Sequence, residues 1–424
     1  MACFPGVYLS RPVVGLLDSA QRELTPSFVH GARCLAAFRG GRKQQARMAN
    51  RNLSNARSAK NDEFYTQYAD IQAEVNAYIE YDPDVFRGKT VLLPCDDPEW
   101  SNFTLFFAQN FARFGLKKLI STSYAAASKR YGQYWQPSLF ETESPRYDEA
   151  KTAVKGKIFT LDHDLNKDGK IDHRDLEWDY LDGDGDFRSS EVRALRDEAD
   201  IIVTNPPFSL FREFLAWIVE ADKKFLIIGN MNAITYKEVF PLIMANKLWM
   251  GESIHSGDRE FAVPDEYELY AAGFRIDENG GRFKKYIRVK GVRWFTNLDH
   301  GRRHQPLELM TSKDNFKFSK HKEVRGRDYQ TYVNCDAIEV PFTDAIPSDY
   351  EGTMGVPISF LDKYCPEQFE IVGVSLDVAR PMAGCVEPDA VFEKGGPRCY
   401  VKVGVKTYKR LYDRILIRAK KGTK

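Results

Sequence analysis

Short apolar runs alternate with segments of helical periodicity through the first part of the chain. The runs have the length and composition of buried strands and lie within Lys89–Asp97, Lys117–Tyr124, Asp200–Thr204 and Lys223–Asn230. Segments with apolar residues at helical spacing follow three of them, at Ser101–Gly115, Ser209–Ala221 and Tyr236–Lys247. Strands that alternate with helices form βαβ units, so the sequence predicts an α/β fold with a parallel sheet covered on both faces.

In such sheets ligands bind beyond the carboxyl ends of the strands. The segments "PCDD" (Pro94–Asp97) and "NPPF" (Asn205–Phe208) both follow predicted strands. We therefore expect them to share one crevice.

The alternation ends at about Gly251. Beyond it, Tyr286–Leu298 predicts a strand, a turn and a second strand, and Phe369–Val374 and Asp413–Lys420 predict short strands. No apolar run approaches the roughly 20 residues that a membrane-spanning helix needs, so we expect no transmembrane segment.

Residues 1–47 differ from the rest of the chain. They contain only two acidic residues, Asp18 and Glu23, together with six arginines. A transit-type presequence has such a composition, and an upstream extension that precedes the fold at Met48 is the interpretation we favour. In either case we expect this segment to be disordered.

Composition indicates a soluble globular protein, with 43% hydrophobic and 29% charged residues. The seven cysteines are scattered and never spaced as Cys-x-x-Cys. This argues against a disulfide framework or a zinc site and fits the reducing cytoplasm, where we expect the protein to act.

Charge is unevenly distributed although the net charge is only +1. Arg282–Arg327 has 14 basic residues against 4 acidic ones, and Arg398–Lys424 has 10 against 1. Lys157–Asp200 has the opposite balance, 7 basic against 14 acidic. Two basic blocks can present a face that binds a polyanion, although solvated surface charge explains either block alone equally well.

The segment Asp200–Phe211, "DIIVTNPPFSLF", carries the most specific chemistry. Prolines cannot donate to a sheet, so the strand must end with Asn205 at its carboxyl edge. The side-chain carbonyl of Asn205 and the backbone carbonyl of Pro206 can accept hydrogen bonds from an aromatic amine, while Phe208 stacks on its ring. This orients the nitrogen lone pair toward an electrophile and stabilises developing charge. A plain strand-ending turn is the alternative.

With its neighbours, this segment resembles the N6-adenine DNA methyltransferases, specifically the EcoRI-type adenine modification methylases. The similar segments, in that family's order, are Lys60–Thr66, Pro94–Phe103, Gly183–Glu191, Asp200–Glu213, Lys224–Glu238 and Val292–Asp299. The resemblance extends from about residue 48 to the C-terminus. It implies a Rossmann-like fold dependent on S-adenosylmethionine (SAM), with a mixed, mostly parallel sheet. Residues 48–250 would form the SAM-binding catalytic domain, and residues 251–424 the remaining sheet strands and the DNA target-recognition region.

The resemblance also implies roles for individual residues. Asn205, Pro206, Pro207 and Phe208 would grip the target adenine. The SAM site would be lined by Phe64, Tyr65, Thr66, Pro94, Asp96, Asp97, Pro98, Asn102, Asp186 and Phe187. Asp186 would accept from the amino group of the cofactor's adenine. Because the first loop lacks Gly-x-Gly and the second strand ends without an acid, Asp96 or Asp97 is expected to bind the ribose hydroxyls.

Such an enzyme must flip its target adenine out of duplex DNA. The two basic blocks would then contact phosphates, and we expect target recognition after about residue 250. Five aromatic residues interleave the first block, and we expect them to be core residues rather than intercalators: Phe283, Tyr286, Trp294, Phe316 and Phe318. A cognate restriction endonuclease is a candidate partner. The recognition sequence and the oligomeric state are not readable from the chain.

"DLNKDGKIDHRD" (Asp164–Asp175) competes with this interpretation because it fits a calcium loop. The candidate ligands are Asp164, Asn166, Asp168, Asp172 and Asp175. The last position has Asp where an EF-hand requires a bidentate Glu, and flanking helices are not evident. We favour no metal site and an acidic surface hairpin.

Other functions stay open. The same Asn-Pro-Pro site can methylate RNA bases or a protein glutamine, but those relatives more often carry Tyr after the prolines and a glycine-rich first loop. An inactive DNA-binding or calcium-responsive protein on this fold is the third possibility, and the intact tetrad argues against it.

Overall fold

The structure, a computed structural model, describes residues 65–96, 101–125, 142, 144–255, 258–263, 274–279 and 282–420. All of them belong to one unit of the chain, Met48–Lys424. The expected extension, residues 1–47, and the expected site residues Phe64, Asp97 and Pro98 lie outside the described residues. Of Tyr65 and Phe283 only the backbone is described.

The largest sheet among the described residues has eight strands and is mixed. In spatial order they are β5 (Glu177–Tyr180), β4 (Lys157–Leu161), β3 (Lys118–Ser123), β2 (Thr90–Leu93), β6 (Ile201–Thr204), β7 (Lys224–Asn230), β12 (Val292–Thr296) and β8 (Trp249–Met250). The central strands β3, β2, β6 and β7 are parallel, and antiparallel pairs flank them on both sides. The predicted α/β fold with a mixed sheet is confirmed, and its parallel part is the centre.

Helices cover both faces of this sheet. Leu92 of β2 and Ile202 of β6 belong to one hydrophobic cluster, whereas Val91 and Val203 belong to the other. This alternation places each face of the central strands in its own core, as expected for strands buried on both sides. The described helices are α2 (Tyr68–Tyr81), α3 (Asn102–Gln109), α4 (Phe111–Phe114), α6 (Glu149–Val154), α7 (Ser190–Glu198), α8 (Phe211–Glu220), α9 (Phe240–Met244), α10 (Ser312–Phe318) and α11 (Ser375–Val378).

Two predicted helices differ in detail from the observed ones. The helix expected at Ser101–Gly115 divides at Asn110 into α3 and α4, and it ends as predicted at Gly115, whose φ is 62°. The helix expected from Tyr236 begins only at Phe240. Pro241 lies in its first turn, where a proline is tolerated because that N–H has no helical partner.

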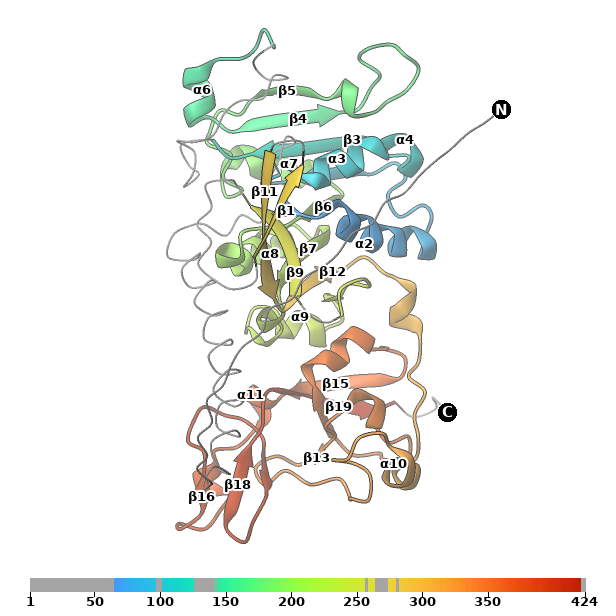
Figure 1. Cartoon of the computed structure of the whole chain (residues 1–424), viewed down its shortest axis with the longest axis vertical. Coiled ribbons are helices and arrows are strands. Elements are labelled where there is room, and N and C mark those ends of the chain that lie inside the picture. Colours follow the sequence, from blue (N-terminus) through green and yellow to red (C-terminus); the bar gives the residue numbers. More distant parts are fainter. Residues whose placement is uncertain are drawn as a thin grey trace, which may run out of the picture. The chain divides into compact units, whose positions relative to one another are not determined.

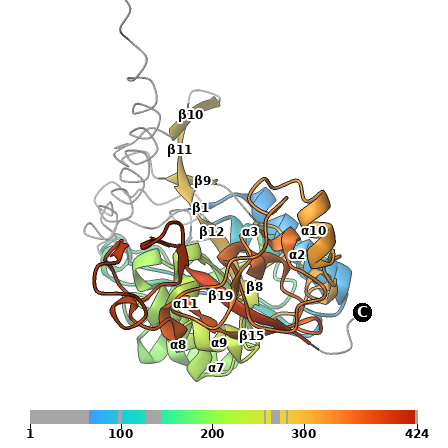
Figure 2. The ribbon, with the colours of Figure 1, turned by 90° about the horizontal axis from the view of Figure 1, so that it is seen from below.

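A second sheet is antiparallel and joins a segment that precedes the central strands of the main sheet to segments that follow them in the sequence. Its order is β1 (Tyr65–Thr66), β9 (Asp258–Val263), β11 (Arg282–Lys290) and β10 (Phe274–Asn279). The predicted strand–turn–strand at Tyr286–Leu298 is confirmed as β11, Gly291 and β12, but the two strands pair in different sheets. β10 and β11 extend away from the other labelled elements (Figure 2).

The C-terminal part forms two smaller sheets. One has the order β13 (Ile338–Glu339), β14 (Met354–Pro357), β19 (Arg414–Ala419) and β15 (Phe369–Val374), and the other β16 (Val391–Phe392), β18 (Thr407–Arg410) and β17 (Tyr400–Lys402). The turn η8 (Ile358–Lys363) contacts edge strand β8, so this part adjoins the β8 edge of the main sheet, far from β5 (Figure 1). Among the described residues, no helix is long and apolar enough to cross a membrane.

Candidate active site

Strand order in the main sheet reverses between β2 and β6. From β2 the chain proceeds outward to β3, and from β6 it proceeds in the other direction to β7. The carboxyl ends of β2 and β6 therefore flank a topological switch point, the place where α/β sheets bind ligands. Both predicted segments, Pro94–Asp97 and Asn205–Phe208, begin at this point.

Asn205 follows the last residue of β6 directly. The parallel ladder ends with Thr204 opposite Ile227, so the strand stops where the prolines begin, as predicted. Pro206 and Pro207 are buried, while Asn205 and Phe208 are half-buried. The Pro207 carbonyl accepts from the Leu210 amide at 2.9 Å, which closes the short turn η4 (Phe208–Leu210).

Thr204 links the two loops at the switch point. Its hydroxyl Oγ1 lies 2.8 Å from the Pro94 carbonyl and 2.6 Å from Asp96 Oδ2, and both oxygens accept from it. The other carboxylate oxygen of Asp96 accepts from Ser101 Oγ at 2.7 Å. Ser101 in turn caps α3 by accepting from the Phe103 amide. We call Pro94, Asp96, Ser101 and Thr204 the switch-point network.

The network fixes the orientation of Asp96. Its side chain is buried, and each carboxylate oxygen points at a hydroxyl inside the protein. Asp96 therefore holds the loop after β2 from within. Neither Thr204 nor Ser101 was predicted as a site residue. Thr204 is 108 residues from Asp96 and Ser101 is 5 residues from it, and no sequence motif links either residue to Asp96.

Cys95 gives this loop its sharp turn. Its φ is 69°, in the left-handed region that glycine usually occupies. The loop has no Gly-x-Gly, so a residue with a side chain adopts the strained conformation here. Strain of this kind, on the order of 1–3 kcal/mol, persists where the surrounding structure enforces it, often at functional sites.

Two further segments predicted to bind the cofactor meet directly. Asn102 Nδ2 donates to the Thr66 carbonyl at 2.6 Å, which joins the start of α3 to β1. Thr66 is itself buried, and among the described residues its hydroxyl has no hydrogen-bond partner.

The loop that carries Asp186 lies against the end of β3. The Ala125 amide donates to the Asp184 carbonyl at 2.8 Å, and a Cβ on Gly185 would lie 2.3 Å from the Ser123 carbonyl oxygen. Gly185, with a φ of 86°, is therefore required for this close approach. The loop brings Asp186 to the same edge of the sheet as Asp96.

Asp186 and Phe187 differ in where their side chains lie: the first pairs with Arg188, and the second lies in the core. Arg188 binds the Asp186 carboxylate through Nε at 2.9 Å and Nη2 at 2.6 Å, and these hydrogen bonds lower the pKa of Asp186. The Phe187 ring is fully buried and packs on Phe214 and Trp217, with centroids 5.1 and 5.7 Å away. The ring thus belongs to the hydrophobic core, and only the backbone of Phe187 is left to contact a cofactor.

Tyr124 is a neighbour that sequence reasoning missed. Burial, and then the nearby Cys95 and Asp186, raise its pKa well above the usual range, so the phenol stays protonated and can donate. It follows β3 directly, so its place at the carboxyl end of a predicted strand was a usable signal.

The loop Asp164–Asp175 connects β4 and β5, which form an antiparallel hairpin. The Asp175 carboxylate is buried and accepts from the amides of Leu165, Asn166 and Asp172. Arg174 Nη2 lies 2.7 Å from Asp168 and 2.8 Å from Asp172. No group of three His, Cys, Asp or Glu side chains suited to a metal ion occurs in the described part of the chain. The arrangement favours the acidic hairpin over a calcium site.

Several residues of the basic blocks form internal ion pairs. Arg293 Nε lies 3.1 Å from Asp362 Oδ1, with both side chains at most 7% exposed. Arg303 is also buried, 3.0 Å from Asp299 and stacked over Trp249. Trp294 is a core residue, as expected, but Phe318 is 61% exposed, so the expectation that these aromatic residues are core is wrong for Phe318.

Comparisons with known proteins identify the family of the chain. The sequence model of the family described as adenine-specific methyltransferase EcoRI matches residues 52–420. Type II methyltransferase M.EcoRI of Escherichia coli is 43% identical over 325 residues, which are 76% of this chain and 89% of that protein. Type II methyltransferase M.MpnI of Mycoplasma pneumoniae is 35% identical over 323 residues, 76% of this chain and 84% of that protein.

Type II methyltransferase M.MgeORF184P of Mycoplasma genitalium is 33% identical over 365 residues, 84% of this chain and 98% of that protein. No solved structure matches the chain significantly. The extent of the family match and the identity to full-length relatives lead to one conclusion: the chain belongs to the EcoRI family of adenine-specific methyltransferases.

Proposed function

We propose that this methyltransferase transfers the methyl group of SAM to the N6 nitrogen of an adenine flipped out of a specific site in duplex DNA. It would act in the cytoplasm within a restriction-modification or orphan modification system. The observation that carries the proposal is the direct link, through Thr204, between the loop after β2 and the Asn205–Phe208 tetrad. Three relatives named Type II methyltransferases support the DNA substrate.

The residues at the switch point fit SAM. The left-handed turn at Cys95 allows close approach of the backbone, and the Thr66 hydroxyl is buried without a partner among the described residues. A carboxylate has about four lone-pair sites. Arg188 occupies three of those on Asp186 through Nε, Nη2 and its amide, which leaves one for the amino group of a bound adenine.

The structure changes which residues we expect to contact SAM. Asp96 would position the loop rather than bind the ribose, because its side chain is buried and both of its carboxylate oxygens accept from hydroxyls inside the protein. Asp97, outside the described residues, stays the candidate for the ribose hydroxyls. Tyr124 joins Thr66, Asn102 and Asp186 as a candidate lining residue.

The tetrad supplies orientation rather than a strong base. SAM provides an electrophilic methyl group bound to a sulfonium. The Asn205 side-chain carbonyl and the Pro206 backbone carbonyl accept from the adenine amine, which draws its lone pair out of conjugation and stabilises the positive charge that develops on nitrogen. The ring of Phe208, half-buried at the start of η4, holds the base by stacking.

The test is methyl transfer from labelled SAM to unmodified duplex DNA, with modified adenines mapped by sequencing. Asn205→Ala should lower the rate at least about 100-fold, the effect of removing one well-placed polar group, while SAM binding is retained. Asn230→Ala is the matched control, because Asn230 ends the adjacent strand β7 and donates to the Lys290 carbonyl instead.

Parallel reactions with RNA and with protein substrates separate the alternatives. Transfer to RNA or to glutamine in place of DNA would sink the proposal. Equal rates for wild type and Asn205→Ala would remove the role given to the tetrad.

A further inference from the structure

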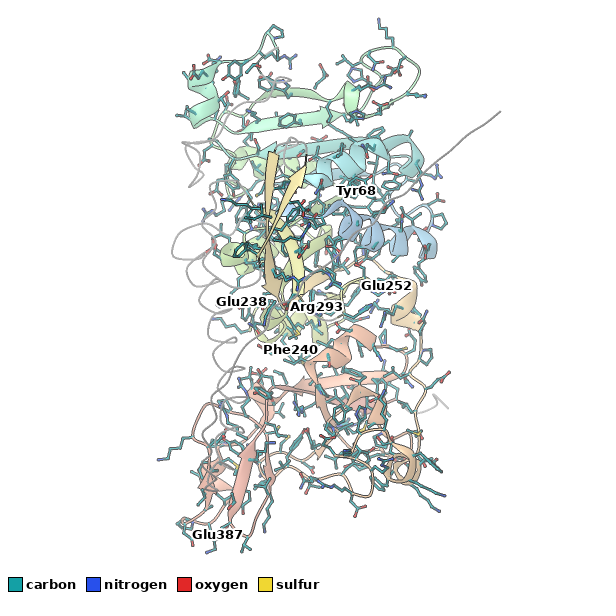
Figure 3. The ribbon with its side chains drawn as sticks, viewed as in Figure 1. Tyr68, Glu238, Phe240, Glu252, Arg293 and Glu387 are labelled. Atoms are coloured by element: carbon teal, nitrogen blue, oxygen red, sulfur yellow. The ribbon has the colours of Figure 1, made fainter. Side chains whose placement is uncertain are left out.

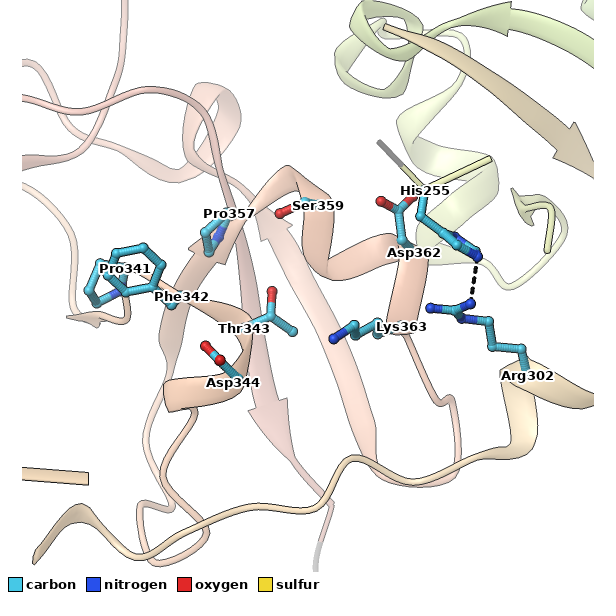
Figure 4. A pocket seen from close by; sticks show the side chains of 10 residues that line it. All are labelled: His255, Arg302, Pro341, Phe342, Thr343, Asp344, Pro357, Ser359, Asp362 and Lys363. Carbon is cyan, nitrogen blue, oxygen red and sulfur yellow. Dashed lines mark hydrogen bonds between the residues drawn. The ribbon is translucent and has the colours of Figure 1, made fainter. Parts of the chain in front are cut away.

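A cavity of about 450 Å³ lies at the seam between the main sheet and the C-terminal sheet (Figure 4). His255 and Arg302 line it from the side of the main sheet. Thr343, Ser359, Asp362 and Lys363 line it from the C-terminal side. We call it the seam pocket, and none of the roles assigned above uses it.

The two carboxylates in the seam pocket are already neutralised from outside it. Asp362 pairs with Arg293, which also donates to the His255 carbonyl at 2.6 Å. Asp344 pairs with Lys320 at 2.7 Å and with His321 at 2.8 Å. Neither Arg293 nor Lys320 lines the pocket.

The two cations that line the seam pocket differ in their partners. Arg302 donates to His255 Nε2 and pairs with Glu252, whose Oε1 lies 3.7 Å from Arg302 Nη1. Lys363 is exposed and forms no ion pair among the described residues. Burial and the neighbouring arginines lower the pKa of His255 to about 4, so this ring is neutral at pH 7. The positive charge of Lys363 is therefore the one that leaves the pocket with an excess of positive charge.

The side chains that line the seam pocket also suit an oxyanion. Figure 4 shows Lys363 extended toward Thr343, and Arg302 pointing up toward His255, so both cations face the space between the two sides. Hydroxyls of Thr343 and Ser359 add neutral donors to the lining. The volume accommodates a sugar–phosphate unit and lies within the usual range of ligand sites.

The position of the pocket relates it to the tetrad. Arg293, at the start of β12, is opposite Gly229 near the carboxyl end of β7, and Figure 3 labels it. Only β7 separates β12 from β6, whose carboxyl end carries Asn205. β8 follows β12 in the sheet, and η8, which carries Lys363 and Ser359, contacts β8. At about 4.8 Å per strand the pocket therefore lies at least about 14 Å from β6, which spans about four base pairs of DNA.

From this geometry we infer that the seam pocket binds a backbone phosphate of the substrate DNA, about four to six base pairs from the flipped adenine. Lys363 and Arg302 are the charged contacts, and Thr343 and Ser359 are the hydroxyl donors. The inference rests on the proposed function and adds to it Lys363, which lies outside both basic blocks. A DNA phosphate at this seam would clamp the target-recognition part against the catalytic sheet when substrate binds.

The first experiment measures the affinity of the full-length protein for a duplex that contains its mapped methylation site, between 50 and 200 mM salt. Lys363→Ala should weaken binding about three- to tenfold and reduce the slope of log Kd against log salt by about one. Lys363→Arg should retain both. Lys247→Ala is the control, because this exposed lysine precedes the amino end of β8, which runs parallel to β7, and does not line the pocket.

The second experiment places one neutral methylphosphonate linkage at each phosphate within six base pairs of the target adenine. One position should weaken binding by wild type and cause no further loss in Lys363→Ala. An unchanged salt slope in Lys363→Ala overturns the inference, and so does the absence of such a position. Stabilisation of wild type, but not of Lys363→Ala, by inorganic phosphate without DNA would overturn it if both proteins bind DNA equally well, because the pocket would then hold a free anion and not a DNA phosphate.

The two proposals fail separately. A protein that binds and methylates duplex DNA while Lys363→Ala behaves as wild type refutes only the phosphate site. A protein that neither binds nor methylates any duplex refutes the proposed function.

Discussion

Two buried carboxylates in this molecule are held by opposite means. Asp96, at the switch point, accepts hydrogen bonds from the hydroxyls of Thr204 and Ser101. Asp362, at the seam, pairs with the guanidinium of Arg293. Asp96 joins two loops of the proposed catalytic centre, whereas Asp362 joins η8 to strand β12 of the main sheet.

The difference indicates what each carboxylate is for. A hydrogen bond from a hydroxyl to a charged carboxylate typically contributes about 1.5–3 kcal/mol to stability. It fixes position, and a displacement of 1 Å in an active site can cost about 100-fold in rate. A buried ion pair that loses one partner costs about 3–5 kcal/mol because a charge is left uncompensated. We therefore expect changes at the switch point to affect mainly rate, and changes at the seam to affect mainly stability.

Thr204→Val tests the first half of this comparison and has the largest expected effect. It removes the hydroxyl that ties Asp96 and the Pro94 carbonyl to the residue before Asn205. The rate of methyl transfer should fall about 100-fold, with KM for SAM changed much less, and Thr204→Ser should restore most of the rate. Single-turnover kinetics with saturating SAM and DNA measure it.

Thr296→Val is the matched control. Thr296 is equally buried, and its hydroxyl donates to the Phe225 carbonyl at 2.7 Å, at the amino end of β7. It should lose a similar free energy of unfolding with no comparable loss of rate. Similar rate losses in both variants would mean that Thr204 is only a stabilising residue.

Asp362→Asn tests the expectation that changes at the seam affect stability, through the pH dependence of the free energy of unfolding. Burial, opposed by Arg293, raises the pKa of Asp362 from 3.8 to about 6. Between those values the folded state binds a proton more tightly than the unfolded chain, so this carboxyl's contribution to stability falls as pH rises from about 4 through 6 and is constant above about pH 7. The asparagine does not titrate.

The difference in unfolding free energy between wild type and Asp362→Asn should therefore change by on the order of 2 kcal/mol between pH 4 and 6, and stay constant from pH 7 to 8. Chemical denaturation at each pH measures it. A difference that is flat across the whole range would show that Arg293 keeps Asp362 ionised throughout.

The comparison also explains which features could be predicted from sequence. Apolar runs located β2, β3, β6 and β7, because central strands buried on both faces need continuous apolar residues. Pro206 and Pro207 located the end of β6, because a proline has no N–H to donate to the sheet. Asp96 was correctly placed at the switch point, but its orientation depends on Thr204, 108 residues away, which no local pattern reports.

Tertiary packing accounts for the other differences. The Phe187 ring enters the core because Phe214 and Trp217 of α8 form a site for it, and the sequence does not reveal that contact. The pairing of β11 with β9, rather than with β12, is likewise a choice between sheets that the strand pattern leaves open. The seam pocket is assembled from residues after β8 and after β12 and from the C-terminal sheet, so only the folded chain defines it.

The loop Asp164–Asp175 holds its carboxylates both by uncharged donors and by an arginine, and changes here have the smallest expected effect. Backbone amides hold Asp175, and Arg174 bridges Asp168 and Asp172. A calcium ion would have to displace that guanidinium, so 1 mM Ca²⁺ should raise the free energy of unfolding by less than about 0.5 kcal/mol, which corresponds to a Kd above roughly 1 mM. Arg174→Gln frees the two carboxylates while leaving the amides that hold Asp175. Calcium stabilisation that appears only in this variant would show that the guanidinium of Arg174 occupies the place that a metal ion would take. A gain above about 1 kcal/mol in wild type would instead show that the sequence pattern of a calcium loop prevails over the ion pairs.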